Sequence, residues 1–181
     1  MEKLRLTNSL QVFMYDQNDY LQNQKQILSD LQKVIDSFDY DKNLEQSKEY
    51  LFNLNSDIFL DNTNVKIFVL FLNKTAISFA VIKNQSLDLF WTHFDYVKLG
   101  YATILLRAMC IMLYNQNAFK FCVQEDNDNL IFSSLLNSFK KLEEIKFSEK
   151  TAKNGKKTLN FDIKNIKTDE ILLNIQKIAI N

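Results

Sequence analysis

The stretch YVKLGYATILL, residues 96–106, contains Gly100, one of only two glycines in a chain of 181 residues. Gly100 stands where an expected strand ends and an expected apolar helix begins. A strand that enters a helix through a small residue leaves several unpaired backbone N–H groups directed at one place, with the positive end of the helix dipole behind them. Gly100 and Ala102 have so little side chain that a phosphate could approach this backbone closely. The stretch therefore predicts an anion site, with a purely structural helix entry as the alternative.

Upstream of this stretch, the hydrophobic pattern predicts a strand, two helices and then a meander of three strands. The first strand spans residues 10–15, and Asn18 or Asp19 caps the helix that follows. A second helix spans about 43–55. The meander consists of strands 65–72, 76–82 and 86–94, and Asn73-Lys74 makes the first reversal. Strict alternation divides the last strand into two faces, Leu87, Leu89 and Trp91 on one and Asp88, Phe90 and Thr92 on the other.

Downstream, the pattern predicts helix 101–114, strand 118–124, helix 129–142 and strands 145–150 and 157–163. Asn154-Gly155 between the last two strands is a strong hairpin signal, and Thr168 caps a final helix. No repeat or linker divides the chain. We therefore expect one domain over residues 1–166, followed by a helical extension over residues 167–181.

The stretch around Gly100 resembles the pyrophosphate loop of the GNAT family of acetyl-CoA-dependent N-acetyltransferases. That loop reads R/Q-x-x-G-x-G/A, followed by two residues and a Leu-Leu pair, and Gly100, Ala102, Leu105 and Leu106 fall on its positions. Tyr96 matches the aromatic residue common before the loop. The expected order of elements is also that of the GNAT fold, with the last helix as an addition. The resemblance implies an α+β fold, an α/β/α sandwich in which helices flank a mixed, mostly antiparallel sheet.

The resemblance also implies acetyl-CoA as cofactor. Its pantetheine arm would lie along Thr92, His93 and Phe94, at the end of the fourth expected strand. Asn127, or Asn129 if the register slips by two residues, would border the arm. The pyrophosphate would be held by the backbone amides of Val97, Lys98, Leu99, Gly100, Tyr101, Ala102 and Thr103.

Three departures from the family pattern concern charge and acid catalysis. Val97 stands at the Arg/Gln position, and Lys98 replaces the middle glycine and could supply the lost cation. Many GNAT enzymes carry a tyrosine general acid in the helix after the fifth strand, but this chain has no tyrosine after Tyr114. The equivalent position falls on Ser134 or Phe139.

Acetyl transfer to an amine needs a base, and Asp88 and His93 are the candidates. Their structural alternatives are a carboxylate that faces solvent and a partly buried, hydrogen-bonded histidine. Two functions therefore stay open. One is a GNAT-type N-acetyltransferase that transfers acetyl from acetyl-CoA to an amine of unknown identity. The other is a catalytically weak or inactive GNAT-fold subunit with a structural or binding role in a larger protein assembly.

Composition and charge argue against several other classes. Lys+Arg and Asp+Glu both number 22, so no basic field supports general nucleic-acid binding. The amino terminus lacks the apolar core of a secretory signal, and no apolar run reaches the ~20 residues of a membrane span. We expect an intracellular, cytoplasmic protein. Cys110 and Cys122 lack metal-ligand spacing, so we expect two reduced core thiols and no metal site.

Helix 102–114 has Arg107 as its only charged residue. A helix that is apolar nearly all round is expected to be covered on every side. The final helix is one candidate cover, with an apolar stripe of Ile171, Leu172, Ile175 and Ile178, and a protein partner is the other.

Overall fold

The computed structural model describes residues 1–38, 44–58, 64–118, 120–125, 145–151, 157–164 and 166–180. Within these residues, eight strands form one sheet in the order β1-β2-β3-β4-β5-β6-β8-β7. Every neighbouring pair is antiparallel except β5 and β6, which are parallel. The strands are β1 (Glu2–Arg5), β2 (Leu10–Tyr15), β3 (Val65–Leu72), β4 (Thr75–Lys83), β5 (Ser86–Thr92), β6 (Lys120–Glu125), β7 (Ile145–Thr151) and β8 (Lys157–Ile163).

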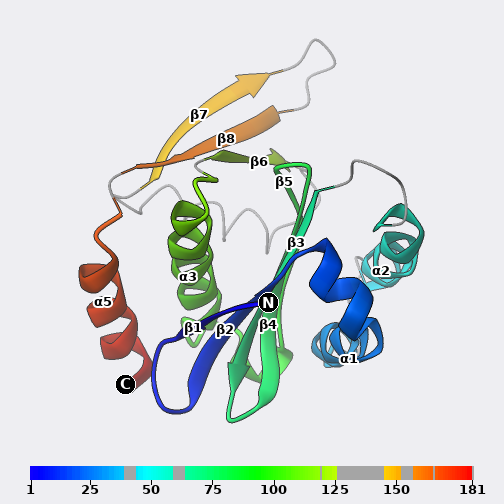
Figure 1. The fold of residues 1–181 in the computed structure, drawn as a ribbon, viewed down its shortest axis with the longest axis horizontal. Coiled ribbons are helices and arrows are strands. Elements are labelled where there is room, and N and C mark those ends of the chain that lie inside the picture. Colours follow the sequence, from blue (N-terminus) through cyan, green and yellow to red (C-terminus); the bar gives the residue numbers. More distant parts are fainter. Residues whose placement is uncertain are drawn as a thin grey trace.

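Helices cover both faces of this sheet. The helices α1 (Gln17–Ile35) and α2 (Leu44–Ile58) lie on one face, and α3 (Tyr101–Asn115) and α5 (Thr168–Ile180) lie on the other (Figure 1). Each face has its own core of buried side chains, one shared with α1 and α2 and the other shared with α3 and α5. The predicted α/β/α sandwich with a mixed, mostly antiparallel sheet is therefore confirmed.

The central meander follows its sequence pattern closely. The strand β3 has the predicted bounds, and the hairpin loop Asn73-Lys74 has positive φ at both residues, 48° and 71°. The loop between β4 and β5, Asn84-Gln85, also has positive φ at both residues, 50° and 68°. Two positive φ angles in a two-residue loop match the right-handed twist of the flanking strands, and asparagine tolerates that conformation.

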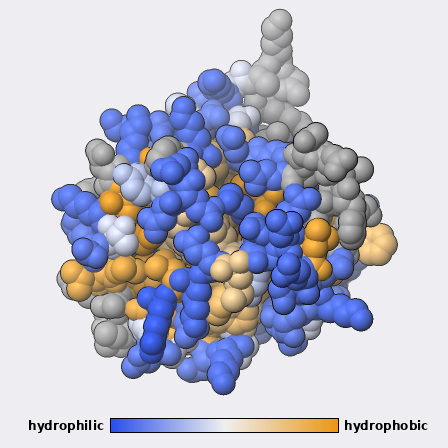
Figure 2. Space-filling model, viewed as in Figure 1, coloured by the Kyte–Doolittle hydropathy of each residue, from blue (hydrophilic) through white to orange (hydrophobic). Residues whose placement is uncertain are grey.

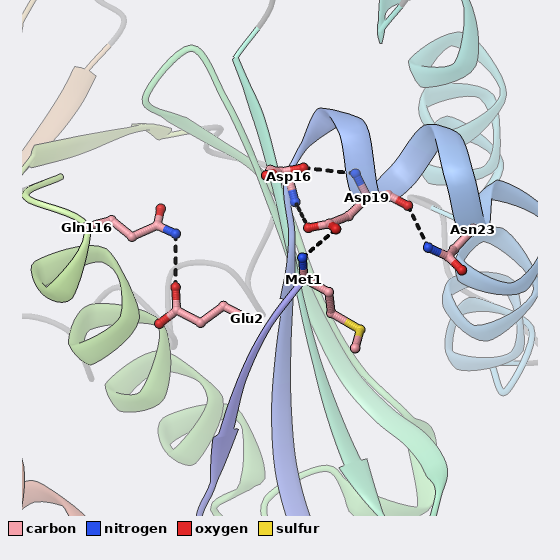
Figure 3. Close-up of polar contacts among 6 residues, drawn as sticks. All are labelled: Met1, Glu2, Asp16, Asp19, Asn23 and Gln116. Atoms are coloured by element: carbon pink, nitrogen blue, oxygen red, sulfur yellow. Dashed lines mark hydrogen bonds and ion pairs between the residues drawn. The ribbon is translucent and has the colours of Figure 1, made fainter.

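The first strand of the sheet, β1, was not predicted. It pairs with β2 from Glu2↔Met14 to Arg5↔Gln11. Four residues with three charges carry too little alternation to indicate a strand, and it is the pairing with β2 that makes the segment extended. Figure 3 shows a second attachment, in which the Gln116 side chain, just beyond the end of α3, donates to Glu2 Oε2 at 2.9 Å.

The start of α1 also differs from its prediction. The N-cap is Asp16, and neither Asn18 nor Asp19. Asp16 Oδ1 accepts from the Asp19 N–H at 2.9 Å, and Asp19 Oδ2 accepts from the Asp16 N–H at 3.2 Å, which completes a capping box (Figure 3). Partial burial acts to raise the pKa of Asp19, but hydrogen bonds from the Met1 ammonium and from Asp16 outweigh it and hold that pKa below its ordinary value.

A bulge in β5 overturns the predicted faces of that strand. Ile82 pairs with Leu87 and Val81 pairs with Leu89, so Asp88 is an extra residue without a partner on β4. Because of this extra residue, the side chains before and after Asp88 point to opposite faces of the sheet, whereas strict alternation predicts the same face for both. Leu87 is buried in the core under α3, whereas Leu89 and Trp91 pack in the core under α1 and α2. Leu87 therefore does not share a face with Leu89 and Trp91.

The apolar helix α3 is buried on all sides but one. Nine of its residues are buried, and α5 contributes Ile171 and Ile175, which are 2% and 0% exposed, to the same core. Figure 1 shows α5 beside α3, and the predicted cover of α3 by the final helix is therefore present within the chain. Viewed from this side, hydrophilic residues dominate the surface, with a hydrophobic stripe at the lower left, around α5 and β1 (Figure 2). Of the helices among the described residues, none combines the length and apolar character that a membrane crossing requires.

The cap of α1 generates a first prediction. We expect Asp16→Ala to lower the free energy of unfolding by about 1 kcal/mol, because it removes the acceptor for the Asp19 N–H. Asp16→Asn keeps an acceptor oxygen and serves as the control, with a loss of a few tenths of a kcal/mol at most. Urea unfolding measures both. Equal stabilities for the Ala and Asn variants would contradict the assigned cap.

The packing of α5 generates a second prediction. Ile175→Ala should destabilise the protein by about 2–5 kcal/mol, because a fully buried side chain leaves a cavity against α3. Leu173→Ala on the same helix is the matched control, since Leu173 is 57% exposed and its loss should change stability by about 0.5 kcal/mol or less. Thermal and urea unfolding would show the contrast. Similar losses for both variants would mean that α5 does not pack as described.

Candidate functional site

The strands β5 and β6 share a single pair, Ser86↔Cys122, and the Cys122 N–H donates to Gln85 O at 2.7 Å. Beyond that pair, the described residues of the two strands make no further pairs with each other. His93 donates its N–H to Ile77 O on β4 at 2.8 Å. Because the backbone groups of successive strand residues point to alternate edges, the N–H and C=O of Thr92 lie on the edge that faces away from β4. On the side of β6, the end of β5 therefore presents backbone groups that pair with no described residue.

A short 3₁₀ turn, Phe94–Tyr96, leads from β5 toward α3, and His93 caps it. His93 Nδ1 accepts from the Asp95 N–H at 3.3 Å, so a neutral His93 carries its proton on Nε2. The ring also packs edge-on against Tyr96, with ring centroids 5.5 Å apart. The Phe94 N–H donates to Ser37 Oγ, next to the end of α1, at 2.9 Å. His93 and Phe94 are thus held by the turn and by α1.

The helix α3 begins at Tyr101, as the sequence predicts. Gly100 is the N-cap residue with φ 87° and ψ −6°, in the left-handed region, and no side chain caps the helix. Lys98 is left-handed as well, with φ 65°. The first bond of the helix runs from the Ile104 N–H to Gly100 O at 3.1 Å. The N–H groups of residues 100–103 make no hydrogen bond to any described residue.

Two amides of the predicted phosphate loop are already used within the turn. The Val97 N–H donates to Phe94 O at 3.1 Å and the Leu99 N–H to Tyr96 O at 3.4 Å. The N–H groups open to a ligand are therefore those of Lys98 and residues 100–103. They stand at the positive end of an apolar helix, and Gly100 has no Cβ to fill the space in front of them. This arrangement fits a phosphate group.

The second candidate region lies on the face of β5 that α1 and α2 cover, where Asp88 contacts α2. Tyr50 donates its hydroxyl to Asp88 Oδ2 at 2.7 Å, and both side chains are partly buried. A second bond joins the same two elements, from Trp91 Nε1 to Ser47 Oγ at 3.1 Å. Tyr50 could not be predicted from the sequence, because 38 residues separate it from Asp88 and no local pattern connects them.

The remaining predicted residues lie as follows. The Thr92 hydroxyl is 2.9 Å from Ser78 Oγ, so its side chain contacts the neighbouring strand β4. The backbone N–H and C=O of Thr92 lie on the edge of β5 that faces away from β4. Cys110 is buried and Cys122 is partly buried, and both are free thiols. Asn127, Asn129, Ser134 and Phe139 lie outside the described residues.

One pocket of about 310 Å³ lies at the other end of α3 and contains none of the predicted site residues. It is lined by Asn64, Lys66, Ile82, Gln85, Leu113, Asn117, Ala118, Lys120 and Phe121. Asp88, the end of β5 and the loop before α3 lie on one continuous segment of the chain, and none of its predicted site residues lines this pocket.

No protein-family model matches the sequence, and no curated protein matches it either. The fold, in contrast, is similar to many solved structures. The ribosomal-protein-S18-alanine N-acetyltransferase from Escherichia coli is 13% identical, with 88% of this chain and 97% of that chain covered and a TM-score of 0.53. A putative GNAT-family acetyltransferase from Desulfovibrio desulfuricans is 8% identical, with 84% and 98% covered and a TM-score of 0.58.

A third similar structure is the PaiA N-acetyltransferase from Thermoplasma acidophilum in complex with coenzyme A. It is 13% identical, with 82% of this chain and 98% of that chain covered and a TM-score of 0.50. At such identities the likeness concerns the fold. The fold of this chain is that of the GNAT N-acetyltransferases.

Proposed function

We propose that the protein is an N-acetyltransferase that moves the acetyl group of acetyl-CoA to an amine. One observation carries this proposal: at the start of α3, left-handed Gly100 opens a row of amides that follows the edge of β5, and neither the amides nor that edge pairs with any described residue. An anion site at a helix terminus next to an open strand edge suits a ligand that joins a pyrophosphate to an amide-containing arm.

The residues present fit each part of that ligand. The amides of residues 100–103 and the Lys98 ammonium would hold the pyrophosphate, because both donate to negative oxygens. The backbone of Thr92 would bind the amides of the pantetheine arm as an added strand would. His93 and Phe94 would flank the arm, since the turn and α1 hold them beside it. The PaiA structure, which holds coenzyme A in the same fold, supports this assignment.

Acetyl-CoA supplies the acetyl group as a thioester, and the protein must supply a base. Asp88 is the base that we favour: its carboxylate accepts the proton that the acceptor ammonium loses. His93 is the less suitable candidate, because its Nδ1 lone pair already accepts from the Asp95 N–H. A thiol ordinarily titrates near 8.5, so the thiolate can leave without a tyrosine acid, although more slowly than with one.

The alternative is a protein that binds coenzyme A without turnover and serves as a subunit of an assembly. The absence of any tyrosine after Tyr114 favours it, since a proton donor is then missing from the position where many GNAT enzymes carry one. The two functions differ in a measurable way, because only the enzyme transfers acetyl to an amine.

Calorimetry with coenzyme A tests the anion site. The wild-type protein should bind, and Lys98→Asn should weaken binding about tenfold at low salt through the loss of a charge-assisted hydrogen bond. Lys74→Asn is the matched control, because Lys74 is also exposed and left-handed but lies in the β3–β4 turn. Gly100→Val should abolish binding, with folding checked by circular dichroism. A wild-type protein that fails to bind at millimolar coenzyme A refutes the proposal.

Acetyl transfer to a panel of amines and short peptides tests the base. Asp88→Asn should lower kcat by about 10²–10⁴-fold, the usual cost of losing general base catalysis. His93→Asn retains a polar side chain at the cap of the turn and should lower kcat less than about tenfold. Coenzyme A binding without transfer to any acceptor would favour the subunit over the enzyme.

A further inference from the structure

We propose that Tyr50 is the positioning residue for Asp88: its hydroxyl holds one carboxylate oxygen so that the other remains available to the acceptor amine. This inference rests on the proposed function, because it assigns Asp88 the role of base. The observation behind it is the contact between Tyr50 Oη and Asp88 Oδ2, at 2.7 Å, between elements that lie far apart in the sequence. The distance is the usual one for a hydroxyl donor and an oxygen acceptor.

Asp88 needs such support because it is the extra residue of a bulge. At a bulge the ladder of strand hydrogen bonds is locally disrupted, and the extra residue has no cross-strand partner to restrict its side chain. Asp88 therefore depends on a contact from outside the sheet, and α2 provides it. Among the described residues, Oδ1 of Asp88 has no hydrogen-bond partner, whereas Oδ2 has Tyr50. One oxygen is held and the other is left for a ligand.

The competing explanation is that Tyr50 only attaches α2 to the sheet. The structure argues against it, because α2 has other attachments to that face. Trp91 Nε1 donates to Ser47 Oγ at 3.1 Å, and Leu51 and Leu54 are 6% and 1% exposed in the core under α1 and α2. The contact with Tyr50 is thus not required to keep α2 in place. Ser47 and Tyr50 each make one hydrogen bond from α2 to β5, which makes them a matched pair for a test.

The test compares the full-length wild type with Tyr50→Phe, Ser47→Ala, Asp88→Asn and the double variant Tyr50→Phe/Asp88→Asn. The acceptor is whichever compound the wild type acetylates fastest in a panel of short peptides and diamines. We expect Tyr50→Phe to lower kcat about 10- to 100-fold, because a misplaced reacting group loses that much. Its acceptor KM and coenzyme A affinity should stay within about twofold of the wild type, and Ser47→Ala should keep kcat within a similar margin.

The double variant separates positioning from stability. If Tyr50 acts only through Asp88, Tyr50→Phe should cause no further loss of kcat in the Asp88→Asn protein. Urea unfolding shows whether each protein is folded at the assay temperature. Equal kcat values for Tyr50→Phe and Ser47→Ala, or the same loss from Tyr50→Phe in both backgrounds, would overturn the inference while acetyl transfer by the wild type still stands.

The results that would refute the proposed function differ from those that would refute the role of Tyr50 alone. A wild type that acetylates nothing in the panel overturns both the enzyme and the role of Tyr50. An active wild type with a fully active Asp88→Asn variant removes Asp88 as base, and with it the positioning role, but leaves the acetyltransferase. Each outcome therefore identifies which statement has failed.

Discussion

The strand β5 is hydrogen-bonded to β4 along its length, but its described residues pair with β6 only at Ser86↔Cys122. Because parallel neighbours need a crossover connection, the chain leaves the end of β5, makes a short turn and returns as α3 before it enters β6. The crossover puts the start of α3 at the end of β5, where the edge away from β4 pairs with no strand in the described part of the chain. Unpaired backbone groups from a strand and from a helix therefore come together in one place, and the candidate site follows from that arrangement.

The bulge at Asp88 gives this strand access to both faces of the sheet. Leu87 packs under α3, and after the extra residue Leu89 and Trp91 pack under α1 and α2. Asp88 thereby meets α2, while the loop at Gly100 opens at the start of α3. The same short segment thus places the proposed anion site near one layer of helices and a carboxylate near the other. The proposed acetyl transfer would use both, the anion site for the cofactor and the carboxylate as the base for the acceptor amine.

Left-handed residues at the loop are tolerated because the elements on either side are held firmly. Lys98 has a positive φ that costs conformational energy for a residue with a Cβ, and such a conformation persists only where the surroundings determine it. The turn before Lys98 is tied to α1 through Ser37, and α3 behind it is buried against the sheet and α5. The packing of α5 against α3 therefore helps to fix the shape of the loop around Lys98 and Gly100, although α5 lies far from that loop in the sequence.

The sequence by itself determined the features whose cause is local. The hydrophobic pattern predicted β3 and β8 with their bounds, and Gly100 marked the place where a strand ends and an apolar helix begins. Only the tertiary structure decided the rest. The strand β1 exists through its pairing with β2, the bulge at Asp88 depends on the register with β4, and Tyr50 reaches Asp88 through the packing of α2. Each of these depends on contacts between distant segments, and such contacts leave no periodic pattern in the residues that make them.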